Sequence, residues 1–241
     1  MTESEVEQVN TYDDFFIILK NNKWFDFMNH GYYPSSDVFE KNYIFKNSAS
    51  LYFNLIEDLD TESKTILDIG CGRGGGVKVF KEYKKFKDIY ACDINASSID
   101  FCKENHPGIN FKTCSSTSLD FNNSSFDIVT NVESSHCYSN INLFLKEVKR
   151  VLNHHGVFCY TDVFFNDYPI EEILKNSGQF KNIVSKNITD NVFNSCIDFI
   201  QCINSNLKDR ALCDYLTRLT KQQAYNYLKG NLQYKKFLCY V

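Results

Sequence analysis

The feature that most limits the possible folds of this chain is a glycine-rich turn in residues 66–76, ILDIGCGRGGG. A short apolar run typical of a buried strand precedes the glycines, and a segment with helical spacing follows them. A turn without side chains lets the backbone approach a ligand closely, and the N-terminus of the following helix favours a negative group. A strand, a glycine turn and a helix in this order predict an α/β fold that binds a small molecule.

Two patterns fit this turn. Read as G-x-G-x-x-G it is a weak signal, which NAD sites share. Read from Asp68 as D-x-G-x-G-x-G it is more specific, because a carboxylate two residues before the first glycine repels a diphosphate. Such a carboxylate suits the ammonium group of the methionine part of S-adenosylmethionine. Asp93 ends the next predicted strand, where a carboxylate accepts hydrogen bonds from ribose hydroxyls.

Short apolar strands alternate with amphipathic helices from residue 64 onward. Strands separated by helices of this length predict a parallel sheet covered on both faces, with ligands bound outside the carboxyl ends of the strands. We expect strands at 65–69, 88–92, 111–114, 127–132 and 156–163, and helices at 75–86, 97–105 and 141–152.

The flanking segments read as mostly helical, and no Gly/Ser-rich linker divides the chain. We interpret residues 1–241 as one domain with an N-terminal helical cap at 1–60, a cofactor-binding core at 61–165, and C-terminal helices and last strands at 166–241. The expected flanking elements are helices within 11–60 broken at 29–36, a helix at 171–181, a strand at 181–186, helices over 191–229 and a strand at 232–241.

Composition excludes several classes of function. The net charge is −4 and no block of lysine and arginine occurs, which disfavours a nucleic-acid partner. No apolar run approaches the roughly 18 residues of a membrane span, and the first residues do not resemble a targeting peptide. The ten cysteines are scattered and form no C-x-x-C pair, so neither a zinc site nor a redox motif is predicted. We expect a cytoplasmic, metal-independent protein with reduced cysteines.

Four further stretches resemble one protein family. They are HGYYP at 30–34, SFDIV at 125–129, NVESSHCY at 131–138 and FLKEVKRVLNHHGVF at 144–158. On these motifs the chain resembles the class I S-adenosylmethionine-dependent methyltransferases over nearly its whole length. Within them it is most similar to small-molecule O-methyltransferases that act on polyketides, glycolipids and sugar-bearing natural products of secondary metabolism. NVESSHCY is the stretch most similar to those enzymes.

The resemblance implies a Rossmann-like sheet, mostly parallel with an antiparallel last strand, and helical caps. It also implies S-adenosylmethionine as cofactor and S-adenosylhomocysteine as product. The glycine turn would wrap the methionine part with Asp68 near its ammonium group, Asp93 would hold the ribose, and Ile94 would pack on adenine. The cofactor-binding residues expected on this basis are Asp68, Gly70, Cys71, Gly72, Gly74, Asp93, Ile94, Ser115, Ser116, Asn131 and Tyr33.

Two positions depart from the family pattern. An aspartate that usually binds the adenine amino group is replaced by Ser115, followed by Ser116. A hydroxyl replaces one hydrogen bond but not the charge, so we expect weaker cofactor binding or compensation by backbone groups. A P-G-G turn is replaced by NHHG at 153–156, which we expect to alter only a surface loop.

The candidate catalytic residues follow two adjacent predicted strands. His136 follows the strand at 127–132, where the reacting methyl group should lie, and its ordinary pKa suits a general base at neutral pH. Asp162 ends the next strand and could orient His136 or bind substrate. Glu133 could do the same, contact the cofactor or structure the turn. Tyr33 and its neighbour Tyr32 would shield the sulfonium or shape the acceptor pocket.

The sequence favours a methyltransferase acting on a hydroxyl of a small, apolar or aromatic molecule. Methylation of nitrogen or carbon by the same fold is the nearest alternative. A catalytically silent cofactor-binding partner protein is a third hypothesis, because Ser115 replaces the usual aspartate. An NAD-dependent oxidoreductase is the fourth, and Asp68 argues against it. The bound ligand and its turnover separate these hypotheses.

Overall fold

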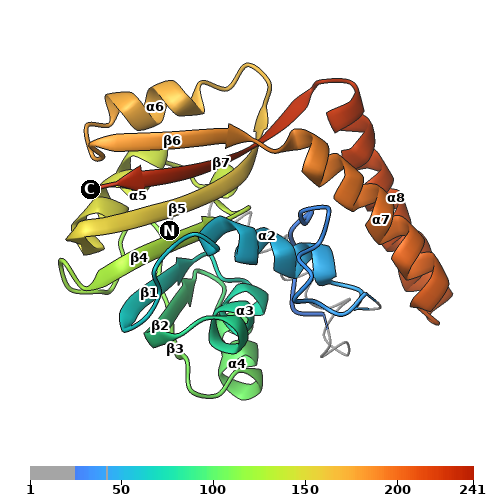
Figure 1. Ribbon diagram of the computed structural model, residues 1–241, viewed down its shortest axis with the longest axis horizontal. Coiled ribbons are helices and arrows are strands. Elements are labelled where there is room, and N and C mark those ends of the chain that lie inside the picture. Colours follow the sequence, from blue (N-terminus) through green and yellow to red (C-terminus); the bar gives the residue numbers. More distant parts are fainter. Residues whose placement is uncertain (1–24, 42) are drawn as a thin grey trace.

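The computed structural model describes residues 25–41 and 43–241, and one seven-stranded sheet organises them (Figure 1). The strand order is β3-β2-β1-β4-β5-β7-β6, in which β7 runs antiparallel to both of its neighbours and the first five strands run parallel. This confirms the expected fold class. The strands are β1 (Lys64–Ile69), β2 (Phe86–Asp93), β3 (Asn110–Thr113), β4 (Phe126–Val132), β5 (Leu152–Phe165), β6 (Asn182–Asn187) and β7 (Leu232–Tyr240).

Helices cover both faces of this sheet because its strands alternate their side chains between two apolar cores. Ile66 and Ile128 belong to the core beneath α2, α3 and α4, whereas Leu67 and Val129 belong to the core beneath α5 and α6. The helices are α2 (Lys46–Ile56), α3 (Gly75–Tyr83), α4 (Ala96–Asn105), α5 (Ile141–Val151), α6 (Ile170–Asn176), α7 (Thr189–Asn206) and α8 (Arg210–Leu228), with a 3₁₀ turn at Ser135–Cys137.

The two longest described helices, α7 and α8, pair with each other and extend beyond the edge of the sheet (Figure 1). The chain then returns through β7, which lies between β5 and β6. The segment 166–241 therefore contributes strands to the same sheet as the segment 61–165. None of the helices in the described part of the chain is both long and apolar enough to cross a membrane.

Several expected boundaries were wrong. The helix expected at 75–86 ends at Tyr83, because Phe86 joins β2. The helix expected at 171–181 ends at Asn176, and Gly178 follows in a left-handed conformation that stops helices. Residues 25–41 form no regular helix, and residues 11–24 lie outside the described part of the chain.

The surface loop expected at 153–156 lies within β5. Leu152 pairs with Phe126, and the next paired residue, Val157, pairs with Ile128. The intervening residues therefore bulge out of the ladder instead of ending the strand. His154 and His155 are exposed there.

Candidate active site

Two cavities of similar size meet at the carboxyl edge of the parallel strands. The first encloses about 540 Å³ over the glycine turn, and the second encloses about 560 Å³ beside β5. Glu133, His136 and Tyr138 line both of them. All three follow β4 directly, as expected for the ligand-binding edge of an α/β sheet.

The backbone N–H groups of the glycine turn are already used within the protein. Gly70 and Cys71 donate to the carbonyl oxygen of Cys92 at 2.8 and 3.1 Å, and Gly74 donates to that of Cys71 at 2.9 Å. Gly72 donates to Oδ2 of Asp93 at 2.8 Å. These four donors are therefore not free to bind a phosphate, which argues against a dinucleotide on this turn.

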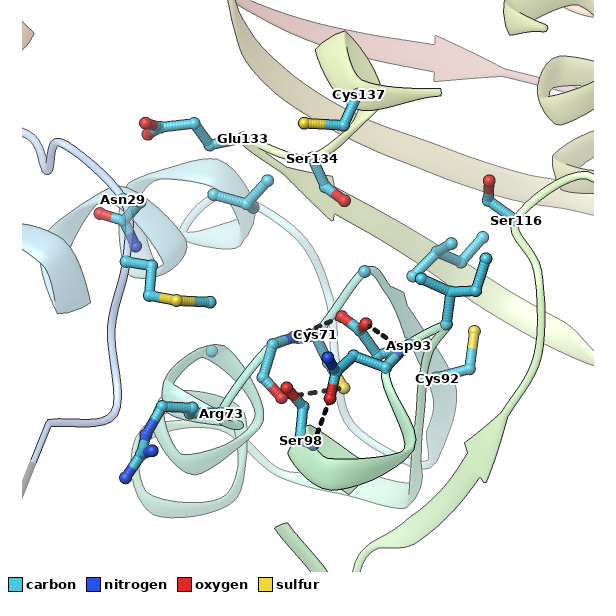
Figure 2. A pocket seen from close by; sticks show the side chains of 18 of the residues that line it. Asn29, Cys71, Arg73, Cys92, Asp93, Ser98, Ser116, Glu133, Ser134 and Cys137 are labelled. Carbon is cyan, nitrogen blue, oxygen red and sulfur yellow. Dashed lines mark hydrogen bonds between the residues drawn. The ribbon is translucent and has the colours of Figure 1, made fainter. Parts of the chain in front are cut away.

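Asp93 lies in the floor of the first cavity, beside Cys71 and Ser98 (Figure 2). Its two oxygens accept hydrogen bonds from the backbone of Gly72 and of Asn95, whose own side chain caps α4. Burial raises the pKa of Asp93, and the backbone N–H donors oppose that rise. A carboxylate has about four acceptor positions, so Asp93 retains the capacity to bind ligand hydroxyls.

Asp68 lies in β1, behind the residues that line the first cavity. Its Oδ1 accepts a hydrogen bond from the Thr130 hydroxyl at 2.7 Å, and its Oδ2 is buried without a hydrogen-bond partner among the described residues. Burial raises the pKa of Asp68 to about 7, which the bond from Thr130 opposes. A buried carboxylate oxygen without a donor is a site at which an ammonium group would be stabilised.

His136 and Asp162 form a close pair between the 3₁₀ turn and β5. Nδ1 of His136 lies 2.7 Å from Oδ1 of Asp162, and the His136 backbone donates to Oδ2 at 3.1 Å. The hydroxyl of Ser135 donates to Oδ2 as well, at 2.6 Å. Because an ionised carboxylate only accepts hydrogen bonds, the pair places the proton on Nδ1. The Asp162 side chain is buried, whereas that of His136 is 35% exposed and borders both cavities.

The charge state of His136 follows from this pairing. Burial lowers the pKa of His136, but the neighbouring Asp162 carboxylate raises it by more, so the pKa lies well above its usual value. In the free protein His136 is therefore an imidazolium near neutral pH. It becomes a proton acceptor as the pH rises.

The hydrogen bonds and the ion pair of Glu133 go to residues other than His136. Glu133 has a positive φ of 50°, and its carboxylate accepts hydrogen bonds from the backbone of His30 and from the Tyr234 hydroxyl, both at 2.9 Å. Its Oε1 also lies 3.3 Å from Nδ1 of His30. Figure 2 shows the Glu133 carboxylate turned away from Asp93. These contacts tie the end of β4 to β7 and to the segment before α2.

Five residues expected to bind the cofactor do not line the first cavity. The Asn131 side chain is buried and donates to the backbone of Ile69, which supports the turn from behind. Tyr33 is 39% exposed, its backbone exchanges hydrogen bonds with Asn191 of α7, and it is not among the residues that line this cavity. Residues outside the lining are Asp68, Gly74, Ser115, Asn131 and Tyr33, whereas Gly70, Cys71, Gly72, Asp93, Ile94 and Ser116 belong to it.

Other lining residues escaped the sequence-based prediction. Met28 and Asn29 close the cavity over the glycine turn, and a Cβ on Gly72 would lie 2.8 Å from the Met28 methyl carbon. No motif marks these two residues. Asn95 could have been found as the N-cap of a helix that follows Asp93, and Tyr138 could have been found as the last residue of NVESSHCY.

Comparison with known proteins identifies this arrangement. The family model for the methyltransferase domain matches residues 67–160. Residues 67–160 are therefore a methyltransferase domain of the class I, S-adenosylmethionine-dependent type. A methyltransferase domain implies S-adenosylmethionine as its cofactor, and the matched range spans the glycine turn, Asp93 and His136.

Two curated relatives are mycobacterial. The chain is 39% identical over 116 residues to the probable phthiotriol/phenolphthiotriol dimycocerosates methyltransferase 2 of Mycobacterium ulcerans, covering 47% of this chain and 45% of that protein. It therefore spans about half the length of this relative. It is 28% identical over 238 residues to the fatty-acid O-methyltransferase of Mycolicibacterium smegmatis, covering 89% of this chain and 82% of that protein.

A solved structure shares the fold over most of the chain. Phosphoethanolamine N-methyltransferase 2 of Haemonchus contortus, solved with phosphomonomethylethanolamine and S-adenosylhomocysteine, matches with a TM-score of 0.74 and 17% identity. The match covers 92% of this chain and 58% of that one. At this identity the match shows the fold alone.

Proposed function

We propose that this protein transfers a methyl group from S-adenosylmethionine to a hydroxyl of a small, lipid-like molecule. The observation that carries the proposal is the meeting of two cavities at His136, whose Nδ1 is held by Asp162. One cavity would hold the cofactor, the other the acceptor, and the proton acceptor stands between them.

The first cavity fits the cofactor. The cofactor supplies an electrophilic methyl group on a positively charged sulfur. Gly70, Cys71 and Gly72 would lie against the methionine part, with the unpartnered Oδ2 of Asp68 as counter-charge for its ammonium group. Asp93 would accept hydrogen bonds from the ribose hydroxyls. The adenine would lie near Ile94 and Ser116, which are on the same wall.

The second cavity fits an acceptor with an apolar body. Val163, Phe164 and Leu232 supply apolar walls, and Phe165, which is 69% exposed, stands where the cavity opens to solvent. Exposed aromatic surface at the opening would cover an alkyl chain too long for the cavity. The names of the two mycobacterial relatives, which refer to fatty acids and to dimycocerosates, favour the same class of acceptor.

The reaction requires a base for the hydroxyl proton and a linear arrangement of the attacking oxygen, the methyl carbon and the sulfur. In the neutral form of His136, Nε2 would take the proton of the acceptor hydroxyl while the hydroxyl oxygen attacks the methyl carbon in line with the departing sulfur. Asp162 holds the imidazole in the required tautomer and stabilises the imidazolium that forms. Ser135 and the His136 backbone keep the Asp162 carboxylate in place.

Ligand binding and turnover test this proposal. Calorimetric titration should give micromolar affinity for S-adenosylmethionine and S-adenosylhomocysteine and none for NAD. With isotope-labelled S-adenosylmethionine, fatty acids, long-chain alcohols and alkylphenols should then be screened for methylation. Failure of the adenosyl ligands to bind would overturn the cofactor assignment. Binding with no methylation of any hydroxyl or carboxyl acceptor would favour the silent partner protein, and labelling of amines instead would favour N-methylation.

The charge of Asp68 gives a pH dependence for cofactor binding. Its pKa in the free protein is about 7, so the ionised form that pairs with an ammonium group is scarce at pH 5.5. We expect affinity for S-adenosylmethionine to rise by about tenfold or more between pH 5.5 and 7.5. The free energy of unfolding of the ligand-free protein should fall over the same window, because the pKa is raised above its unfolded value.

Asp68→Asn is the matched variant, since it keeps the shape of the side chain without its titration. It should bind the cofactor more weakly at pH 7.5, and both its affinity and its stability should vary less with pH than those of the unsubstituted protein. An unchanged pH profile in Asp68→Asn would show that another group titrates. Calorimetry and thermal unfolding at matched pH values measure both quantities.

A further inference from the structure

The second cavity contains a second histidine paired with a carboxylate. Nδ1 of His30 lies 2.8 Å from the Tyr227 hydroxyl and 3.3 Å from Oε1 of Glu133. This pair resembles the one formed by His136 and Asp162, but it is built from other elements, namely the segment before α2, the end of β4 and α8. The methyl-transfer scheme above does not use it.

The two histidines differ in which of the two cavities they line. His136 borders both cavities, whereas His30 lines only the acceptor cavity. His30 is therefore not placed to take a proton at the cofactor. It is placed to contact the part of the acceptor that lies away from the reacting hydroxyl.

The contacts of His30 favour one tautomer. The Glu133 carboxylate accepts hydrogen bonds from the His30 backbone and from the Tyr234 hydroxyl. Of the two oxygens near Nδ1, the Tyr227 hydroxyl at 2.8 Å can donate or accept a hydrogen bond, whereas the Glu133 carboxylate at 3.3 Å only accepts, so a proton on Nδ1 satisfies both contacts. Nε2 is then a hydrogen-bond acceptor, and no partner for it occurs among the described residues. The His30 side chain is 20% exposed, so Nε2 is accessible from the cavity that the residue lines.

We propose that His30 is a specificity-determining residue whose Nε2 accepts a hydrogen bond from a second hydroxyl of the acceptor. The inference rests on the proposed function and refines its substrate class to diols with an apolar body. One hydroxyl lies at His136 and is methylated, and the other lies at His30 and is only bound. An acceptor without the second hydroxyl leaves Nε2 of His30 unpaired, which lowers affinity.

Paired probes test the assignment without turnover. Protein saturated with S-adenosylhomocysteine is titrated with 4-hexylresorcinol and 4-hexylphenol, and with 1,2-octanediol and 1-octanol. The members of each pair differ by one hydroxyl. In at least one pair we expect the dihydroxy compound to bind about tenfold more tightly.

Two variants separate recognition from a purely structural role of the pair. His30→Asn keeps a polar group near the position of Nδ1, and so the contact with Glu133, but removes the acceptor at Nε2. His30→Gln places its amide near the position of Nε2. The preference for the dihydroxy probe should fall below about twofold in His30→Asn and be partly kept in His30→Gln. Thermal unfolding of both variants monitors the contribution of the Glu133 contact to stability.

Three outcomes would overturn the inference. They are equal affinity within both pairs, no binding of any probe, and a loss in His30→Asn that is the same for both members of a pair. None of them bears on the cofactor or on methyl transfer. The proposed function fails instead if S-adenosylmethionine does not bind or if no acceptor is labelled.

Discussion

Replacing His136 by alanine is expected to lower kcat by about 10²- to 10⁴-fold and to leave the affinity for S-adenosylmethionine nearly unchanged. His136 borders both cavities, and its Nε2 can accept a proton once the imidazole is neutral. Without it, the acceptor hydroxyl must lose its proton to water. Turnover with labelled cofactor and calorimetry measure the two quantities.

The pH profile distinguishes a base from a group that only shapes the cavity. Because Asp162 holds the pKa of His136 above its usual value, kcat/KM of the unsubstituted protein should increase with pH above neutrality. His136→Ala should lose this increase. His154→Ala is the control, since His154 is exposed on the bulge of β5 and should change neither rate nor profile. A His136→Ala variant with unaltered kcat would exclude His136 as the base.

Replacing Gly70 by alanine is expected to lower the free energy of unfolding by about 2–4 kcal/mol. Gly70 has a φ of 74°, and a Cβ there would lie 2.1 Å from the Ser134 hydroxyl and 2.7 Å from the Ser134 Cβ. The new methyl group must push Ser134 toward the first cavity, which Ser134 lines. We therefore expect the affinity for S-adenosylmethionine to fall at least about a hundredfold.

Gly178→Ala serves as the control that measures the loss in free energy of unfolding due to the left-handed backbone conformation alone. Gly178 has a similar φ of 65°, but nothing lies within 4 Å of the position that a Cβ would take there. It should lose only about 1 kcal/mol and keep full cofactor affinity. Denaturant unfolding and calorimetry of both variants provide the comparison. Equal effects of the two substitutions would show that the contact with Ser134 is unimportant.

Local patterns in the sequence were enough to predict most of the sheet. Buried strands such as β4 are short apolar runs, and their order along the chain leaves few topologies for an α/β fold. Helix ends were harder to predict, because an apolar residue such as Phe86 fits both the end of a helix and the start of a strand. The left-handed residue after α6, Gly178, was overlooked as a stop signal.

The same reasoning explains which part of the site was predictable. His136 follows β4, and Asp162 lies within β5, the adjacent parallel strand, so their proximity follows from the topology. The contacts of His30 depend instead on packing between segments 103 and 197 residues apart. No periodicity or motif in the sequence encodes such contacts. The position of Tyr33 depends on such packing too, since its backbone is bonded to Asn191 of α7.

Because β7 is the last strand in the chain, the residues that form the two cavities are not all available at the same stage of synthesis. The glycine turn, Asp93, His136 and Asp162 all leave the ribosome well before Tyr227 and Tyr234. Until β7 is made, β6 has no neighbour in the sheet, and Glu133 lacks the hydroxyl of Tyr234. The last residue in the chain that lines the first cavity is Tyr215, whereas the second cavity also needs Gln223 and Leu232, which are synthesised later.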